Sequence, residues 1–155
     1  MFPLLGRRIK KGALTTFTSA AHIVTVILME KSVEVDFTCR VFAVLPHDQK
    51  DPRTVTQLHL RLWNDYGVSP EEKLYLILQA HLALLAKYPL SEFGPPVVHC
   101  SAGVGRTGTF ICSRFLLDQL LKDSSNIDII GTTLAVRRWH KNLVLVDLSF
   151  KTKLI

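Results

Sequence analysis

Residues 98–110 read VHCSAGVGRTGTF, and this stretch decides how the chain is expected to fold. Residues 95–99 (PPVVH), which lead into the cysteine, predict a short buried strand. Residues 107–122 place apolar side chains at helical spacing and predict a helix with one face in a core. The glycine-rich residues between these elements would therefore join the end of a strand to the N-terminus of a helix.

The loop carries a cysteine and an arginine in the pattern C-x5-R, at Cys100 and Arg106. Backbone N–H groups at a helix N-terminus have no partner inside the helix and the dipole is positive there, so a bound anion is stabilised. The same field can lower the pKa of a thiol from about 8.5 to roughly 3.5–7.5, which makes Cys100 a candidate nucleophile. Arg106 has a planar fork of donors that can hold two phosphate oxygens. Gly103 and Gly105 would let the backbone curl around that phosphate.

The loop resembles the signature of the cysteine-dependent protein tyrosine phosphatases, HCxxGxxR(S/T). The matching positions are His99, Cys100, Gly103, Arg106 and Thr107, and Ser101, Ala102, Gly105 and Gly108 agree with the phosphotyrosine-specific branch. The resemblance implies that His99 orients the loop and favours the thiolate, and that Thr107 donates its hydroxyl to the sulfur when it leaves. It also implies a phosphate-binding set formed by Ser101, Ala102, Gly103, Val104, Gly105 and Arg106. A buried structural cysteine before a glycine-rich turn is the alternative interpretation.

Residues 58–70 (LHLRLWNDYGVSP) resemble the family's mobile acid loop, WPDxGVP, with matches at Trp63, Asp65, Gly67 and Val68. The resemblance implies that Asp65 protonates the departing tyrosine oxygen and later acts as base for the hydrolytic water. An ordinary turn would also account for a segment rich in Asn, Asp and Gly. Asn64 stands where the family has proline, and without a fixed φ the closed loop is expected to be less well defined.

The chain is expected to be a shortened copy of the family's domain, similar to copies in expanded viral families of the polydnavirus type. The family segment that carries the tyrosine-recognition loop has no counterpart before residues 1–3 (MFP), so weaker selectivity is expected. Val136, Arg137, Leu143 and Val144 resemble the approach to the family's glutamine loop. Leu145 and Ser149 then occupy its two glutamine positions. This loss predicts slow hydrolysis of the phosphoenzyme.

Composition predicts one domain over residues 1–155, which are 48% hydrophobic with a net charge of +6. That charge would attract phosphorylated proteins. The basic cluster Arg7, Arg8, Lys10 and Lys11 lacks interleaved aromatics, so no nucleic-acid partner is expected. Cys39, Cys100 and Cys112 have neither metal-ligand nor disulfide spacing, so we expect no metal and no cofactor. No apolar signal peptide or membrane span is recognised, so the expected location is the cytoplasm. For a virus-encoded protein this would be the cytoplasm of the host cell.

Predicted strands cover residues 21–29, 33–44 and 54–63, with turns at 30–32 and 46–53. Further helices are predicted over residues 70–87 and 127–139, the first with Ser69 as N-cap and Glu72 completing a capping box. Strands followed by helices predict an α/β domain with a mixed β-sheet flanked by helices, a tyrosine-phosphatase-like fold lacking its N-terminal part.

The expected activity is hydrolysis of phosphotyrosine in proteins through a phosphocysteine intermediate, with impaired turnover. Two alternatives stay open: a catalytically weak pseudophosphatase that binds phosphorylated proteins, and a compact dual-specificity phosphatase. Phosphotyrosine-containing proteins are the expected partners. The oligomeric state is not predicted.

Overall fold

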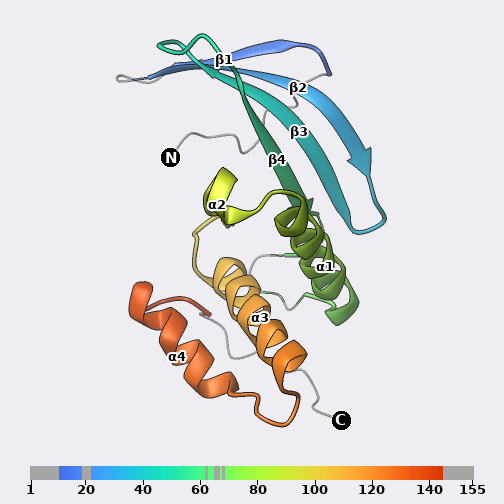
Figure 1. Cartoon of the computed structure of the whole chain (residues 1–155), viewed down its shortest axis with the longest axis vertical. Helices are drawn as coiled ribbons and strands as arrows, with labels where there is room; N and C mark the ends of the chain where they lie inside the picture. Colours follow the sequence, from blue (N-terminus) through green and yellow to red (C-terminus); the bar gives the residue numbers. More distant parts are fainter. Residues whose placement is uncertain (1–10, 19–21, 62, 65–66, 68, 145–155) are drawn as a thin grey trace. The chain divides into compact units, whose positions relative to one another are not determined.

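The computed structural model describes residues 11–18, 22–61, 63–64, 67 and 69–144 (Figure 1). The chain divides into two compact units, Met1–Arg61 and Leu62–Ile155. The first unit contains a β-sheet and the second contains helices, so the predicted α/β class is confirmed. The prediction of a single domain over residues 1–155 stays a prediction.

The first unit is an antiparallel meander in which each strand bonds to the next one along the chain. Its strands are β1 (Leu14–Thr18), β2 (Ile23–Val33), β3 (Phe37–Pro46) and β4 (Arg53–Leu60). β-branched and aromatic residues fill them, as sheet propensity requires. The strand-to-strand pairing is antiparallel throughout the described residues, and only an isolated bridge from Lys11 to Leu28 is parallel. No parallel pair of strands, as a mixed sheet would require, therefore occurs among them.

β2 is longer than predicted because it continues through the turn expected at residues 30–32. Glu30 pairs with Val41 and Lys31 with Arg40, after a register shift between Leu28 and Glu30. The hairpin instead closes at residues 34–36, where the Glu34 N–H donates to the Phe37 carbonyl at 2.9 Å. Residues 30–32 are polar and exposed, which is typical of a turn, but here they continue the strand.

The helices of the second unit are α1 (Glu71–Lys87), α2 (Leu90–Phe93), α3 (Gly105–Lys122) and α4 (Ile129–Trp139). The three long helices confirm the predictions, with α3 starting two residues earlier and α4 two residues later than expected. The single turn α2 lies between α1 and the cysteine loop, where no element was predicted. Apolar side chains at helical spacing explain why the long helices could be predicted.

The predicted capping box at the start of α1 is wrong. Pro70 occupies the N-cap position, and no side chain caps the helix. The Ser69 hydroxyl donates instead to the Pro70 carbonyl at 3.2 Å. At α4, by contrast, the Asp128 side chain caps the helix by accepting the Gly131 N–H at 2.7 Å.

The strand predicted over residues 95–99 is also wrong. These residues have no regular secondary structure, and Val97 is 88% exposed. Two successive prolines remove the N–H groups with which a strand would pair. No described strand bonds to this segment. The two apolar valines predict a buried strand, but Val98 is only half-buried and Val97 is exposed.

The core of the second unit joins α3, α4 and the residues after α4. It consists of Cys112, Val136, Leu143 and Val144, with Ile111 packed against them. Cys112 is fully buried in this core. Gly108 lets the chain approach α3 closely: a Cβ there would overlap the Val144 nitrogen and contact Leu143 at 3.0 Å. The segment after α4 therefore packs directly on the first turns of α3.

Gly108→Ala is expected to destabilise the protein by about 1–3 kcal/mol, because the added methyl meets backbone that cannot rotate away. The matched control is Gly105→Ala, whose Cβ would meet no atom within 4 Å. Urea unfolding monitored by circular dichroism measures both variants. Equal unfolding midpoints for Gly108→Ala and the unsubstituted protein would contradict the close packing described above.

Candidate active site

The cysteine loop bends directly into the N-terminus of α3. Gly103 has φ of +75°, a conformation that glycine adopts without strain. It lets the Gly103 N–H turn back and donate to the Cys100 sulfur at 3.2 Å. Val104 follows at the N-cap position, with no side-chain cap. The first N–H groups of α3 are thus available near the sulfur, as anion binding requires.

Two opposing effects set the pKa of the Cys100 thiol. Partial burial, the largest single influence, raises it because the thiolate loses solvation. The Thr107 hydroxyl and the backbone N–H groups of Thr107, Gly103 and Val104 lower it. The stabilising groups together outweigh burial, so the net pKa lies below the ordinary cysteine value. The sulfur is therefore biased toward the nucleophilic, ionised form.

Thr107 supplies the hydroxyl that comes first among the groups lowering the pKa of Cys100. Its hydroxyl oxygen is buried, and it makes no hydrogen bond of normal geometry within the described part of the chain. The hydroxyl dipole still stabilises negative charge on the sulfur. A buried hydroxyl without a full partner is available to donate once the sulfur carries more charge.

Arg106 connects the cysteine loop to the segment predicted to be the acid loop. One terminal nitrogen of its guanidinium donates to the Ser101 hydroxyl at 2.7 Å, and the other donates to the Trp63 carbonyl at 2.9 Å. These two partners are neutral oxygens. The two bonds hold the planar guanidinium beside the cysteine loop.

The described residues of the predicted acid loop, Trp63, Asn64 and Gly67, are joined by hydrogen bonds. Trp63 is buried, and its indole N–H donates to the Gly67 carbonyl at 2.9 Å. The Gly67 N–H donates to the Asn64 carbonyl at 3.2 Å. Tertiary structure thus brings the carbonyl of Trp63, one of the residues that match the family's acid loop, to Arg106. Asp65 and Val68 lie outside the described residues, so the place of the predicted acid stays a prediction.

His99, Ser101 and Ala102 are exposed, while Val104 and Gly105 are half-buried. The groups that lower the pKa of Cys100 do not include His99. Its predicted role in favouring the thiolate remains a prediction. Leu145 and Ser149, the positions predicted to lack the family's glutamines, lie outside the described residues.

Sequence reasoning did not select Arg137 as a functional residue, although it noted the segment that contains it. The guanidinium of Arg137 donates to the Leu143 carbonyl at 2.9 Å and to the Val144 carbonyl at 2.8 Å. Apart from the resemblance to the approach of the glutamine loop, the signal was a basic residue in the last turn of a helix followed by a short loop. That pattern is too common to indicate a specific contact.

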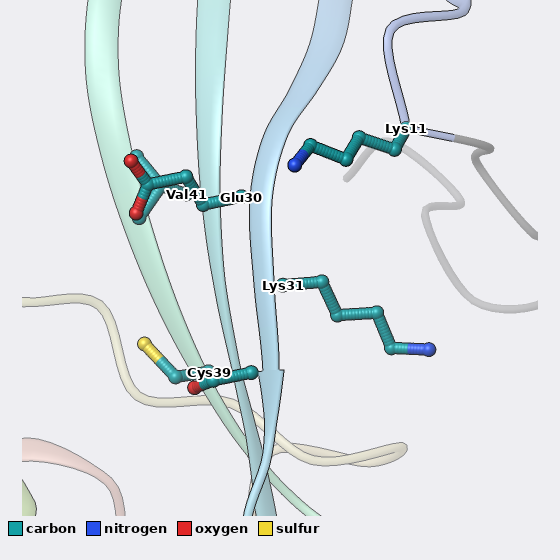
Figure 2. A pocket seen from close by; sticks show the side chains of 6 residues that line it. Lys11, Glu30, Lys31, Cys39 and Val41 are labelled. Carbon is teal, nitrogen blue, oxygen red and sulfur yellow. The ribbon is translucent and has the colours of Figure 1, made fainter.

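The first unit has a cavity of its own, of about 280 Å³, on the sheet (Figure 2). It is lined by Lys11, Glu30, Lys31, Ser32, Cys39 and Val41. The Lys31 ammonium and the Glu30 carboxylate point in opposite directions (Figure 2). Burial and the nearby Glu34 and Glu30 carboxylates raise the pKa of Cys39. The surroundings of Cys39 therefore shift its pKa in the opposite direction from those of Cys100.

A family model described as protein-tyrosine phosphatase matches residues 10–151. The chain belongs to the protein-tyrosine phosphatase family. It is 36% identical over 121 residues to receptor-type tyrosine-protein phosphatase epsilon of Rattus norvegicus, an alignment covering 76% of this chain and 17% of that protein. It is 37% identical over 125 residues to tyrosine-protein phosphatase corkscrew of Drosophila melanogaster, covering 75% and 14%. The family resemblance inferred from the signature is confirmed.

This member of the protein-tyrosine phosphatase family spans less than a fifth of the length of these curated relatives. A longer alignment, 137 residues at 34% identity, joins 88% of the chain to 8% of receptor-type tyrosine-protein phosphatase V of Rattus norvegicus. Across the described residues, no helix is both long enough and apolar enough to cross a membrane.

Thr107→Val is expected to raise the pKa of Cys100, because it removes a hydroxyl that stabilises the thiolate. Thr107→Ser keeps a hydroxyl and serves as the control. The rate of alkylation by iodoacetamide, followed against pH by mass spectrometry of the Cys100 peptide, measures the shift. Cys39 and Cys112 provide internal references, since burial raises both of their pKa values. An unchanged midpoint in Thr107→Val would show that the hydroxyl does not act on the sulfur.

Proposed function

We propose that the chain hydrolyses phosphotyrosine in proteins, without a metal or cofactor, through a phosphocysteine formed on Cys100. The observation that carries the proposal is the lowered pKa of this thiol at the N-terminus of α3, with the Arg106 guanidinium held beside the same loop. A thiolate facing an anion-binding loop is suited to attack phosphorus. Membership of the family supports the same chemistry.

In the first step of the proposed reaction, the Cys100 sulfur donates an electron pair to phosphorus. An S–P bond forms and the P–O bond to tyrosine breaks. By the family resemblance, Asp65 supplies the proton to the departing phenolate oxygen. Arg106 and the N–H groups of residues 101–105 hold the three equatorial oxygens, whose charge rises in the transition state.

In the second step, water attacks the phosphocysteine and gives its proton to Asp65. The S–P bond breaks, inorganic phosphate is released, and the sulfur leaves as a thiolate that receives the Thr107 hydroxyl as a donor. Leu145 and Ser149 stand where the family has glutamines that position this water. Turnover is accordingly proposed to be slower in this step than in the first.

The proposed substrates are phosphotyrosine-containing proteins in the cytoplasm. If the gene is viral, this is the cytoplasm of the host cell. The net charge of +6 favours encounters with phosphorylated, acidic segments. No nucleic-acid partner is proposed. Selectivity for phosphotyrosine would come from a recognition surface outside the cysteine loop.

Mixing the protein with p-nitrophenyl phosphate is expected to give a burst of nitrophenol, close to one equivalent per protein, followed by a slower steady state. A fast first transfer and slow hydrolysis of the phosphocysteine produce that pattern. Stopped-flow absorbance measures it. Cys100→Ser should abolish both phases, and Asp65→Asn should slow the burst by on the order of 10²-fold. Release that persists in Cys100→Ser would reject the mechanism.

Vanadate provides a readout of the pocket that does not depend on turnover. It mimics the pentavalent phosphorus state and should raise the thermal unfolding midpoint of the protein, because a ligand that binds only the folded state stabilises it. Arg106→Ala is the matched variant and should lose the shift. Absence of a shift in the unsubstituted protein would indicate that no phosphate pocket forms.

Asn64, in place of the family's proline, favours a second candidate function: a pseudophosphatase that captures phosphorylated proteins. Phosphopeptide binding that survives without turnover, and is lost in Arg106→Ala, would support that function over the enzyme. A dual-specificity phosphatase would release phosphate equally well from phosphotyrosine and phosphothreonine peptides.

A further inference from the structure

Arg137 lies in the last turn of α4, within bonding distance of the chain that follows the helix. Its Nε atom donates to the Leu143 carbonyl at 2.9 Å, and a terminal nitrogen donates to the Val144 carbonyl at 2.8 Å. The carbonyl-bearing residues, Leu143 and Val144, are 6% and 4% exposed. Hydrogen bonds from a charged fork to carbonyls at a buried site hold backbone firmly in place.

The segment held by Arg137 has a strained backbone. Val144 has φ of +58°, which side chains branched at Cβ rarely adopt. Such a conformation persists only where the surroundings determine it, and such residues cluster at functional sites. Here the surroundings are the two bonds from Arg137, the buried Val144 side chain and one further bond made by the Val144 N–H.

That further bond reaches the cysteine loop. The Val144 N–H donates to the Val104 carbonyl at 3.3 Å, and the Gly108 N–H donates to the same carbonyl at 2.9 Å. Val104 is the residue whose own N–H acts on the Cys100 sulfur. Val144 therefore helps to orient the peptide between Val104 and Gly105, and the N–H that acts on the sulfur belongs to the adjoining peptide, between Gly103 and Val104.

We propose that Arg137 is a positioning residue, which fixes the phosphate-binding loop by holding Leu143 and Val144 against Val104. The inference deepens the proposed function and rests on it. Arg137 acts through backbone geometry, since its charge is not among the groups that influence Cys100. The charge does act on Cys112, which packs in the same core as Val144.

The test compares Arg137→Lys and Arg137→Gln with a matched control, Arg138→Gln, on the neighbouring exposed residue of the same helix turn. Lysine keeps the charge and most of the stem but cannot bond both carbonyls at once. Three readouts are taken on the purified full chain: alkylation of Cys100 by iodoacetamide at pH 6.5, vanadate affinity, and thermal unfolding. The first two report on the loop and the third on stability.

Both Arg137 variants are expected to lower the alkylation rate of Cys100 and the vanadate affinity by about three- to tenfold. For alkylation, this loss corresponds to a rise of up to about one unit in the pKa of Cys100. Arg138→Gln should leave both unchanged. If Arg137→Gln does not fold, Arg137→Lys decides the matter, because it retains the charge near Cys112. Full rescue by lysine would mean that charge, not the fork, matters, and would overturn the positioning role.

Arg137 variants with a lower unfolding midpoint but unchanged Cys100 alkylation and vanadate affinity would show that Arg137 is merely structural. Equal losses of alkylation and vanadate affinity in Arg138→Gln would show the same. Failure of the underlying function looks different. In that case the unsubstituted protein would itself show neither rapid alkylation of Cys100 nor vanadate binding. The two failures are therefore separated by the unsubstituted protein alone.

Discussion

The carbonyl oxygen of Val104 is the constraint on which the candidate site depends. It accepts the N–H of Gly108, which starts α3, and the N–H of Val144, which ties down the chain after α4. These bonds orient the peptide between Val104 and Gly105 at the end of the loop, and within the same loop the Gly103 N–H donates to the Cys100 sulfur. In the proposed positioning role of Arg137, this shared acceptor is the link between the chain after α4 and the donors around the sulfur.

The balance at Cys100 shows why such orientation matters. Burial is the largest single influence on this thiol and by itself disfavours the thiolate. Cys112 illustrates the outcome when burial dominates: the Thr133 side chain and Arg137 act in the opposite direction, yet its pKa remains raised. At Cys100, a hydroxyl and several aligned backbone donors act together and reverse the sign. A proposed nucleophile and an inert core cysteine thus differ mainly in the donors around them.

Several features could be predicted because they depend on neighbours in the sequence. The apolar spacing of residues 107–122 indicated α3, and the signature from His99 to Thr107 indicated the loop and the family. Predictions that required knowledge of partners were less accurate. The valines of residues 95–99 suggested a strand, but no described strand pairs with them. Glu30 and Lys31 suggested a turn, yet pairing with β3 keeps them in β2.

The sequence by itself determined the chemical groups and their order: a cysteine, an arginine six positions further on, and glycines where the backbone must bend. Only the tertiary structure decided which remote groups hold that loop. It brought the Trp63 carbonyl to Arg106 and placed the Arg137 fork on the carbonyls of Leu143 and Val144. The physical reason is that a hydrogen bond depends on distance and direction in space, and residues far apart along the chain leave no local pattern that reveals either.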